Sequence, residues 1–270
     1  MDNAFILGLR ENEVDKIMQA HSWTRLMGRV LPPCIRFFNR HNSILKLSFG
    51  FDAWNEFYDI RKSYRYKEHM LKGYMTSIEQ AINIYHCLVQ TIVMEVPGDV
   101  VELGCYEGNT AILLRQTLDS YGSHKALHVY DSFEGLPEPS PYDRTWKKGM
   151  LTTTQDRLIE NFKKHNAQMP AVHPGWFKDT LPTELPEQIS FAHLDGDFYA
   201  SILESLNFVY PRLSKNAVVV VDDYCDPAIL DLNNVLPGVK KACDEFLADK
   251  PEKMVVMIAG PECHAFFRKE

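Results

Sequence analysis

The sequence lacks the patterns that mark several large classes of protein. Its six cysteines form no C-x-x-C pair, so we expect buried thiols of a reducing compartment and neither a zinc site nor a disulfide framework. No apolar run approaches the roughly 18 residues of a membrane-spanning helix, and residues 1–16 lack the apolar core of a signal peptide. The net charge of -7 argues against a nucleic-acid partner. We therefore expect a cytoplasmic protein without a membrane span.

Several familiar catalytic motifs are also missing. The chain has no G-x-S-x-G nucleophile elbow and no phosphate-binding P-loop. Its ten histidines show no spacing typical of metal ligands. His193 stands in an apolar run, where we expect a core residue whose hydrogen bonds are satisfied. These absences leave the acidic residues as the main candidates for chemistry.

The dominant feature is a pair of apolar strands that each end in two acids. The strands are expected at 189–194 (ISFAHL) and 217–221 (AVVVV), and the segment between them, 199–210, has apolar residues at helical spacing. The acids are Asp195 and Asp197 after the first strand and Asp222 and Asp223 after the second. A strand–helix–strand unit makes the strands parallel neighbours, so both acid pairs meet at the carboxyl edge of the sheet, where open α/β sheets bind ligands.

Four carboxylates at one edge need an explanation, because like charges repel and raise each other's pKa. A bound divalent cation removes this conflict, and a site built from oxygen atoms suits Mg²⁺, Ca²⁺ or Mn²⁺. The alternative is that the acids are helix N-caps and loop residues without a shared ligand. We favour the metal site, because two pairs of acids follow neighbouring strands.

A glycine-containing turn marks a second candidate site. The expected strand 99–103 runs into Glu102-Leu103-Gly104-Cys105-Tyr106-Glu107-Gly108, and a helix is expected over 111–120. Small residues in such a turn let a ligand approach the backbone. The G-x-G-x-x-G spacing of dinucleotide sites is absent, and the acids Glu102 and Glu107 would repel a pyrophosphate. They favour S-adenosylmethionine, which brings an ammonium and a sulfonium group.

Two further positions could contact such a cofactor. Asp131 ends the second expected strand, 126–130, where an acid can accept hydrogen bonds from ribose hydroxyls or can simply belong to the following loop. Trp176 and Phe177 follow a short third strand and either pack on an adenine ring or fill the core.

The segment 132–154 is long and rich in proline, glycine and charge. Loops of this length without secondary structure are usually functional or disordered, and at the carboxyl edge this one is typical of a mobile substrate loop. Thr153 is expected to cap a helix that follows at 154–165.

Five motifs together resemble one known family, the macrocin O-methyltransferases, which methylate sugar hydroxyls on natural products such as macrolides and aminocoumarins. The resemblance covers residues from about Met75 to the C-terminus. In chain order the motifs are V-E-L-G from Val101, D-S-F-E-G-L-P from Asp131, P-G-W-F-K-D-T-L-P from Pro174, L-D-G-D from Leu194, and V-D-D-Y from Val221.

The resemblance implies S-adenosylmethionine and Mg²⁺ as cofactors and assigns roles to individual residues. Asp195, Asp222 and Asp223 would hold the metal, and Asp197 would act as the base. The cofactor would contact Glu102 and Gly104 at its methionine end, Asp131 at its ribose, and also Met75, Gly108, Ser132 and Trp176. The chain departs from the family at Tyr106-Glu107-Gly108-Asn109, where the family often has W-R-G-G, and at Tyr74-Met75-Thr76-Ser77, where it has a T-M-I-G-type sequence.

The implied architecture is α/β: a Rossmann-like class I methyltransferase fold with a mostly parallel seven-stranded sheet and helices on both faces. We expect this domain at 73–270. Residues 1–72 are expected to form a helical N-terminal extension that acts as a lid or in homo-oligomerisation. The expected partner is a small, glycosylated acceptor.

Three alternatives remain at this stage. A catechol-type methyltransferase shares the E-L-G turn and an acidic metal site, but it tends to carry a lysine base, and none is found near Asp195. An NAD-dependent oxidoreductase is disfavoured by the spacing of the turn and its acids. A catalytically silent cofactor-binding protein is argued against by the intact D-G-D and D-D motifs.

Overall fold

The computed structural model describes residues 76–226, 236–259 and 262–270. The expected extension 1–72 and Met75 lie outside these residues, so the division of the chain at residues 72 and 73 stays a prediction. No helix among the described residues has the length and apolar character needed to cross a membrane.

The described residues alternate between strands and helices. The helices are α3 Ile78–Val93, α4 Asn109–Ser120, α5 Gln155–Lys164, α6 Phe177–Glu184, α7 Tyr199–Val209, a 3₁₀ turn at Tyr210–Arg212, and α8 Pro237–Leu247. The strands are β1 Asp99–Leu103, β2 Leu127–Asp131, β3 Ala171–Pro174, β4 Ile189–Leu194, β5 Leu213–Asp222, β6 Val255–Ala259, and β7 Glu262–Arg268.

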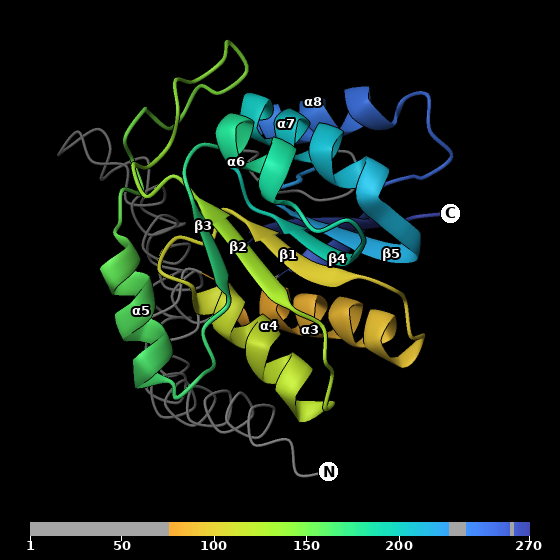
Figure 1. Ribbon diagram of the computed structural model, residues 1–270. Coiled ribbons are helices and arrows are strands. Elements are labelled where there is room, and N and C mark those ends of the chain that lie inside the picture. Colours follow the sequence, from red (N-terminus) through yellow and green to blue (C-terminus); the bar gives the residue numbers. More distant parts are fainter. Residues whose placement is uncertain (1–75, 227–235, 260–261) are drawn as a thin grey trace, which may run out of the picture. The chain divides into compact units, whose positions relative to one another are not determined.

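The strands form one seven-stranded sheet in the order β3-β2-β1-β4-β5-β7-β6. The first five are parallel, and β7 pairs antiparallel with both β5 and β6. Helices α6, α7 and α8 cover one face, and α3 and α4 cover the other (Figure 1). The predicted α/β architecture with a mostly parallel sheet is confirmed.

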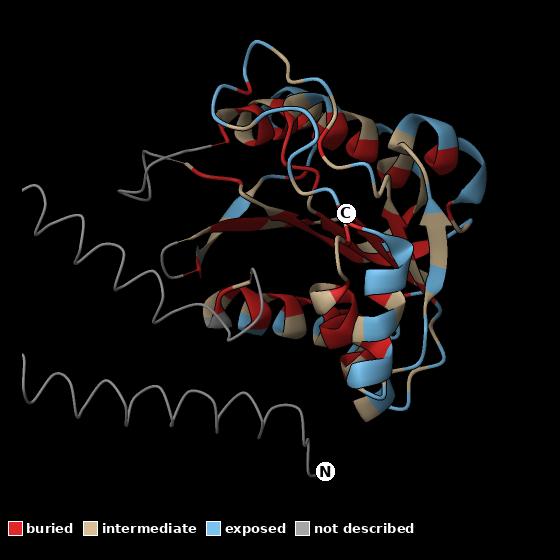
Figure 2. Cartoon of the chain, turned by 90° about the vertical axis from the view of Figure 1, so that its left-hand side faces the viewer, coloured by how far each residue is buried: buried red, intermediate tan, exposed pale blue. Residues whose placement is uncertain are grey.

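The centre of the sheet is built from the two apolar strands. Every residue of β4 is buried, as are Ala217 to Val221 in β5. The sheet lies between the two helix layers, and most of its residues are buried (Figure 2). Full burial of a valine or leucine side chain contributes about 1.5–3 kcal/mol, which explains why near-continuous apolar runs form central parallel strands.

Element boundaries follow the sequence signals with a few corrections. The predicted strands 99–103 and 189–194 match β1 and β4, but β5 begins at Leu213, four residues before the predicted start. The early part of β5 contains polar residues and a left-handed Asn216 (φ 67), and the register with β4 shifts there, so the apolar pattern starts late.

The predicted cap of α5 was wrong. Thr154, not Thr153, is the N-cap, and its side chain accepts from the Arg157 backbone N–H at 3.3 Å. Thr153 is buried instead. Helix α6 was not predicted, because Pro182 inside it is a signal against a helix.

Candidate active site

The carboxyl ends of β1, β2, β4 and β5 lie at one edge of the sheet, since these strands are parallel neighbours. Each is followed within three residues by a non-glycine residue in the left-handed region: Tyr106 (φ 47), Phe133 (φ 57), Asp197 (φ 58) and Asp223 (φ 59). Such backbone strain collects at functional sites, where the surrounding structure has to enforce it. The loops expected to carry the chemistry are therefore also the strained ones.

The predicted acids meet at this edge in two overlapping groups. Ligand atoms of Asp195, Asp197 and Asp223 lie within 4.8 Å of one another, and so do those of His193, Asp195 and Asp222. Asp195 belongs to both groups. The arrangement thus brings together the three expected ligands and the expected base, and it adds a histidine that the sequence had not indicated as a ligand.

Burial and neighbouring carboxylates raise the pKa of three of these acids, Asp195, Asp197 and Asp223. Burial is the main reason that the pKa of Asp195 and of Asp223 is well above its ordinary range, and the Asp222 carboxylate adds to it. Burial, together with Asp222 and Asp131, raises the pKa of Asp197 to about 7. A cation at this edge would relieve the repulsion, and the oxygen donors of Asp195, Asp197 and Asp223 fit a hard divalent ion.

Asp222 is held by the first turn of α3. Its Oδ1 accepts from Gln80 Nε2 at 2.7 Å and from the Asp223 backbone N–H at 3.1 Å, and this leaves Oδ2 for other partners. Ser77 and Gln80 form a capping box: the Ser77 N–H donates to Gln80 Oε1 at 2.8 Å, and the Gln80 N–H donates to Ser77 Oγ at 3.1 Å. The box occupies Gln80 Oε1 and so turns the amide nitrogen toward Asp222.

His193 is buried, as predicted, but it is not satisfied. Its Nδ1 lies 3.1 Å from Glu102 Oε1, and both side chains are 1% exposed. Its Nε2 is buried and has no hydrogen-bond partner among the described residues. The expectation of a core histidine with all hydrogen bonds made is therefore wrong, because the strand pattern reports burial and not partners.

The glycines of the predicted cofactor loop have structural reasons of their own. Gly104 (φ +93) approaches the β4 loop so closely that a Cβ would lie 1.9 Å from the Asp195 carbonyl oxygen. Gly108 (φ +82) precedes α4, and a Cβ there would meet Leu158 and Phe162 of α5 at 2.8 and 2.9 Å. The turn is therefore packed directly against the acidic loop, and two candidate sites lie side by side.

Asp131 joins the first two loops of the edge. Its Oδ2 accepts from the Tyr106 backbone N–H at 2.8 Å, and its Oδ1 accepts from the Phe133 N–H at 2.7 Å. Burial raises the pKa of Asp131, while these hydrogen bonds oppose the rise. Each oxygen keeps a lone pair for a hydroxyl donor. Ser132 closes its own turn, because its Oγ donates to the Gly135 carbonyl at 3.1 Å and accepts from the Glu134 N–H.

The two aromatic residues after β3, Trp176 and Phe177, lie in different surroundings. Phe177 packs against the core, whereas Trp176 is partly exposed and is the N-cap of α6. The core-filling alternative therefore holds for Phe177, and a contact of Trp176 with a cofactor stays a prediction.

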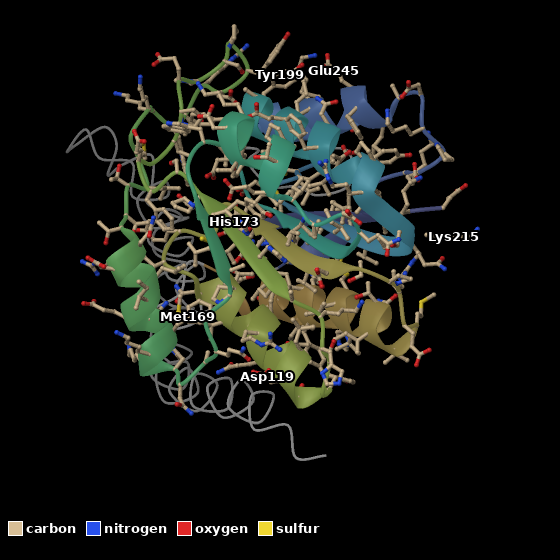
Figure 3. All side chains as sticks on the ribbon, in the orientation of Figure 1. Asp119, Met169, His173, Tyr199, Lys215 and Glu245 are labelled. Carbon is tan, nitrogen blue, oxygen red and sulfur yellow. The ribbon has the colours of Figure 1, made fainter. Side chains whose placement is uncertain are left out.

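The loop between β2 and α5 lies beside α6 (Figure 1), and hydrogen bonds of Asp143 hold the middle of the loop in place. Asp143 is 5% exposed, and it accepts from the Tyr199 backbone N–H at 3.0 Å and from the Ser140 N–H at 2.9 Å. Tyr199 also donates its hydroxyl to Glu245 Oε2 at 2.7 Å, and the two side chains stand together at the top of Figure 3. Asp143 thus ties the predicted substrate loop to the helix that follows Asp197.

Sequence patterns missed three residues of this edge: Gln80, Asp143 and His193. The spacing of Ser77 and Gln80 is a capping-box signal, but it does not reveal the contact with Asp222. Asp143 stands in a loop without periodicity. The spacing of His193 and Asp195 in H-x-D is too common to suggest a ligand pair.

Comparison with known proteins gives a consistent group of relatives. Residues 67–252 match the family model described as macrocin-O-methyltransferase (TylF). The chain is 33% identical over 167 residues to the mycinamicin III 3''-O-methyltransferase of Micromonospora griseorubida, covering 57% of this chain and 66% of that protein. It is 32% identical over 185 residues to the demethyldecarbamoylnovobiocin O-methyltransferase of Streptomyces niveus, covering 64% of this chain and 67% of that protein. The chain thus spans about two thirds of the length of these relatives.

Among solved structures, the O-methyltransferase NovP is similar to this chain with a TM-score of 0.62 and 29% identity, over 72% of this chain and 80% of that one. The predicted class I methyltransferase fold is confirmed by this likeness together with the sheet order.

Proposed function

Because this chain belongs to the macrocin O-methyltransferase family, we propose that it transfers a methyl group from S-adenosylmethionine to a sugar hydroxyl of a glycosylated small molecule. The observation that carries this proposal is the cluster of four aspartates at the carboxyl edge, packed against the glycine turn. Mg²⁺ is the proposed metal, since the proposed ligands Asp195, Asp222 and Asp223 offer only oxygen donors.

The four aspartates have two proposed tasks. Asp195, Asp222 and Asp223 hold the cation. A divalent ion bound there would lower the pKa of an acceptor hydroxyl, which is otherwise a poor nucleophile near pH 7. Asp197 takes the hydroxyl proton, and a pKa of about 7 suits a base that works near neutral pH. The left-handed backbone conformation of Asp197 (φ 58) fixes the position of its carboxylate in a tight turn. Correct positioning of the reacting groups supplies much of the rate acceleration of a methyl transfer.

The cofactor is proposed to lie over the turn that follows β1. Glu102 and Gly104 stand at its methionine end, and Asp131 accepts hydrogen bonds from the ribose. Ser132, Trp176 and the backbone of Gly108 border the remaining surface, and Met75 would contribute from the segment before α3. The close packing of Gly104 on the Asp195 loop supports a short path between the cofactor and the acids.

The acceptor is proposed from the relatives and from the loop above the site. The relatives are named for the O-methylation of mycinamicin III and of demethyldecarbamoylnovobiocin. The 132–154 loop presents the partly exposed ring of Tyr142 over α7, where it lies 5.0 Å from the ring of Tyr199. Aromatic faces of this kind suit the apolar surfaces of sugars and polyketides. Cytoplasmic location and homo-oligomeric assembly remain proposals of the same kind.

The test has two stages. Calorimetric titration of S-adenosylmethionine into the protein establishes cofactor binding; if the folded protein does not bind it, the methyltransferase proposal fails. Formation of S-adenosylhomocysteine is then measured with a panel of glycosylated macrolides and aminocoumarins whose target hydroxyls are free. Turnover above background with at least one acceptor is the expected result, and no turnover with the entire panel would refute this acceptor class.

Asp197→Asn tests the proposed base. The variant should bind the cofactor normally and lose turnover by at least about a hundredfold. Asp179→Asn, the same change at an exposed position of α6, is the matched control and should retain activity. Equal turnover of Asp197→Asn and the control would remove Asp197 from its role.

A further inference from the structure

One carboxyl group and two imidazoles are buried in the sheet below the acidic edge, and the proposed reaction uses only the carboxyl group. They are Glu102 on β1, His193 on β4 and His264 on β7, none more than 1% exposed. Glu102 and His193 are register partners on neighbouring strands. Burying ionisable groups is costly unless they are paired, so the function of the two histidines needs an explanation.

The Glu102 contact fixes how His193 can act. A carboxylate can only accept a hydrogen bond, so the His193 nitrogen facing it at 3.1 Å, Nδ1, carries the proton. The other nitrogen, Nε2, is then left with a free lone pair. It is fully enclosed and has no hydrogen-bond partner in the part of the chain that the structure describes. An imidazole binds a metal ion through a ring nitrogen whose lone pair is free. The other ring nitrogen of such a histidine commonly donates its N–H to a carboxylate, as His193 Nδ1 does to Glu102.

The neighbours of His193 supply the rest of a coordination site. Ligand atoms of His193, Asp195 and Asp222 lie within 4.8 Å of one another, and Nε2 is the nitrogen that Glu102 leaves available. Asp222 Oδ1 is already occupied by two N–H donors, so Oδ2 is the atom free to coordinate. One nitrogen and two carboxylate oxygens are therefore available to a second cation beside the proposed Mg²⁺ ligands Asp195, Asp222 and Asp223, which form the all-oxygen group.

We propose that His193, Asp195 and Asp222 form a second cation position, which takes a divalent transition metal such as Mn²⁺, Co²⁺ or Zn²⁺. These ions accept an imidazole nitrogen beside carboxylate oxygens more readily than Mg²⁺ does, since Mg²⁺ keeps to oxygen. The two positions share Asp195 and Asp222 and differ in the third ligand, which is His193 in one and Asp223 in the other. This inference rests on the proposed function only in that both draw on Asp195 and Asp222.

Nitrogen coordination gives a direct test that needs no turnover. The full chain is stripped with EDTA and titrated with Mn²⁺, and pulsed electron paramagnetic resonance measures ¹⁴N coupling to the bound ion. We expect coupling to one imidazole in the wild type. It should be absent in His193→Gln, whose Mn²⁺ affinity should fall at least about tenfold while Mg²⁺ affinity is kept. His264→Gln is the matched buried control: its Nε2 is also buried without a hydrogen-bond partner among the described residues and lies 4.0 Å from Asp222 Oδ1, but it belongs to neither ligand group.

A second variant separates the two positions without changing the core. Asp223→Asn removes one ligand of the all-oxygen group only, so it should weaken Mg²⁺ binding and keep the ¹⁴N coupling. Bound Mn²⁺ without ¹⁴N coupling in the wild type, or coupling lost in His264→Gln and kept in His193→Gln, would overturn the inference. Loss of the coupling in Asp223→Asn would overturn it as well.

The outcomes also distinguish this inference from the proposed function. Mg²⁺ and S-adenosylmethionine binding without ¹⁴N coupling would leave the methyltransferase proposal in place and remove the second position. ¹⁴N coupling in a protein that binds no S-adenosylmethionine would support the second position and refute the methyltransferase proposal.

Discussion

The contact between Gly104 and the Asp195 loop makes Gly104→Ala the sharpest test of how the site is assembled. An added Cβ would lie 1.9 Å from the Asp195 carbonyl oxygen, whereas ordinary contact begins at 3.4 Å, so the two loops would have to separate by 3.4 − 1.9 = 1.5 Å. The Asp195 N–H donates to the Leu103 carbonyl at 2.8 Å. A shift of that size breaks this hydrogen bond.

The expected cost has two parts. Breaking a buried hydrogen bond and leaving its groups unpaired costs about 2–4 kcal/mol. Placing alanine at a left-handed position (φ +93) costs about 1 kcal/mol more. The total of about 3–5 kcal/mol corresponds to a fall in Tm of about 6–20 °C for a domain of this size. Binding of S-adenosylhomocysteine should weaken at least about tenfold, since the turn and the acids no longer meet.

Gly122→Ala is the matched control. Gly122 also has a positive φ (+60), but a Cβ there meets nothing within 4 Å. It isolates the conformational penalty, about 1 kcal/mol or about 2–4 °C, and should leave cofactor binding unchanged. Thermal melts in EDTA and calorimetric titration measure both effects. If Gly104→Ala loses no more Tm than Gly122→Ala and binds the ligand normally, the close packing of the two loops is refuted.

Three further predictions concern the residues around this contact. Gln80→Met should weaken Mg²⁺ binding about tenfold or more, measured by calorimetric titration, because it removes the hydrogen bond to Asp222. Ser77→Ala disturbs the same helix cap but keeps the Gln80 amide group, so it should leave Mg²⁺ binding unchanged. Equal losses of affinity in the two variants would mean that Gln80 acts only through the cap. Asp143→Ala should speed tryptic cleavage of the 132–154 loop about tenfold, checked by mass spectrometry, with unchanged affinity for S-adenosylhomocysteine; an unchanged cleavage rate would refute the anchor. The pKa of Asp197 is about 7 when folded and 3.8 ordinarily, so the folded state holds its proton longer, and metal-free stability should fall as the pH rises from about 4 to about 7. The rise in Tm caused by Mg²⁺ should therefore grow over the same range. Calorimetric scans should find that Asp197→Asn reduces both trends without abolishing them, because the raised pKa values of Asp195 and Asp223 act in the same direction. A variant whose pH dependence equals that of the wild type would contradict the assignment to Asp197.

The sequence alone determined the elements whose signals are local. The continuous apolar runs at β4 and at Ala217–Val221 predicted buried parallel strands, because only strands covered on both faces tolerate such runs. The acids that follow them were placed at one edge by the rule that parallel neighbours end together. The family and the candidate roles of Asp195, Asp197 and Asp223 followed from motifs that are contiguous in the chain.

Only the tertiary structure decided which distant side chains meet. Gln80 reaches Asp222 across 142 positions of the chain, and Glu102 reaches His193 across 91. No periodicity encodes such pairs, since a strand pattern reports which face is buried and not which partner a polar atom finds there. The structure therefore added the support beneath Asp222, the anchor of the predicted substrate loop, and a buried histidine beside the acids whose Nε2 has no hydrogen-bond partner among the described residues. The physical reason is that these features depend on hydrogen-bond geometry between neighbouring elements, which exists only once the sheet has formed.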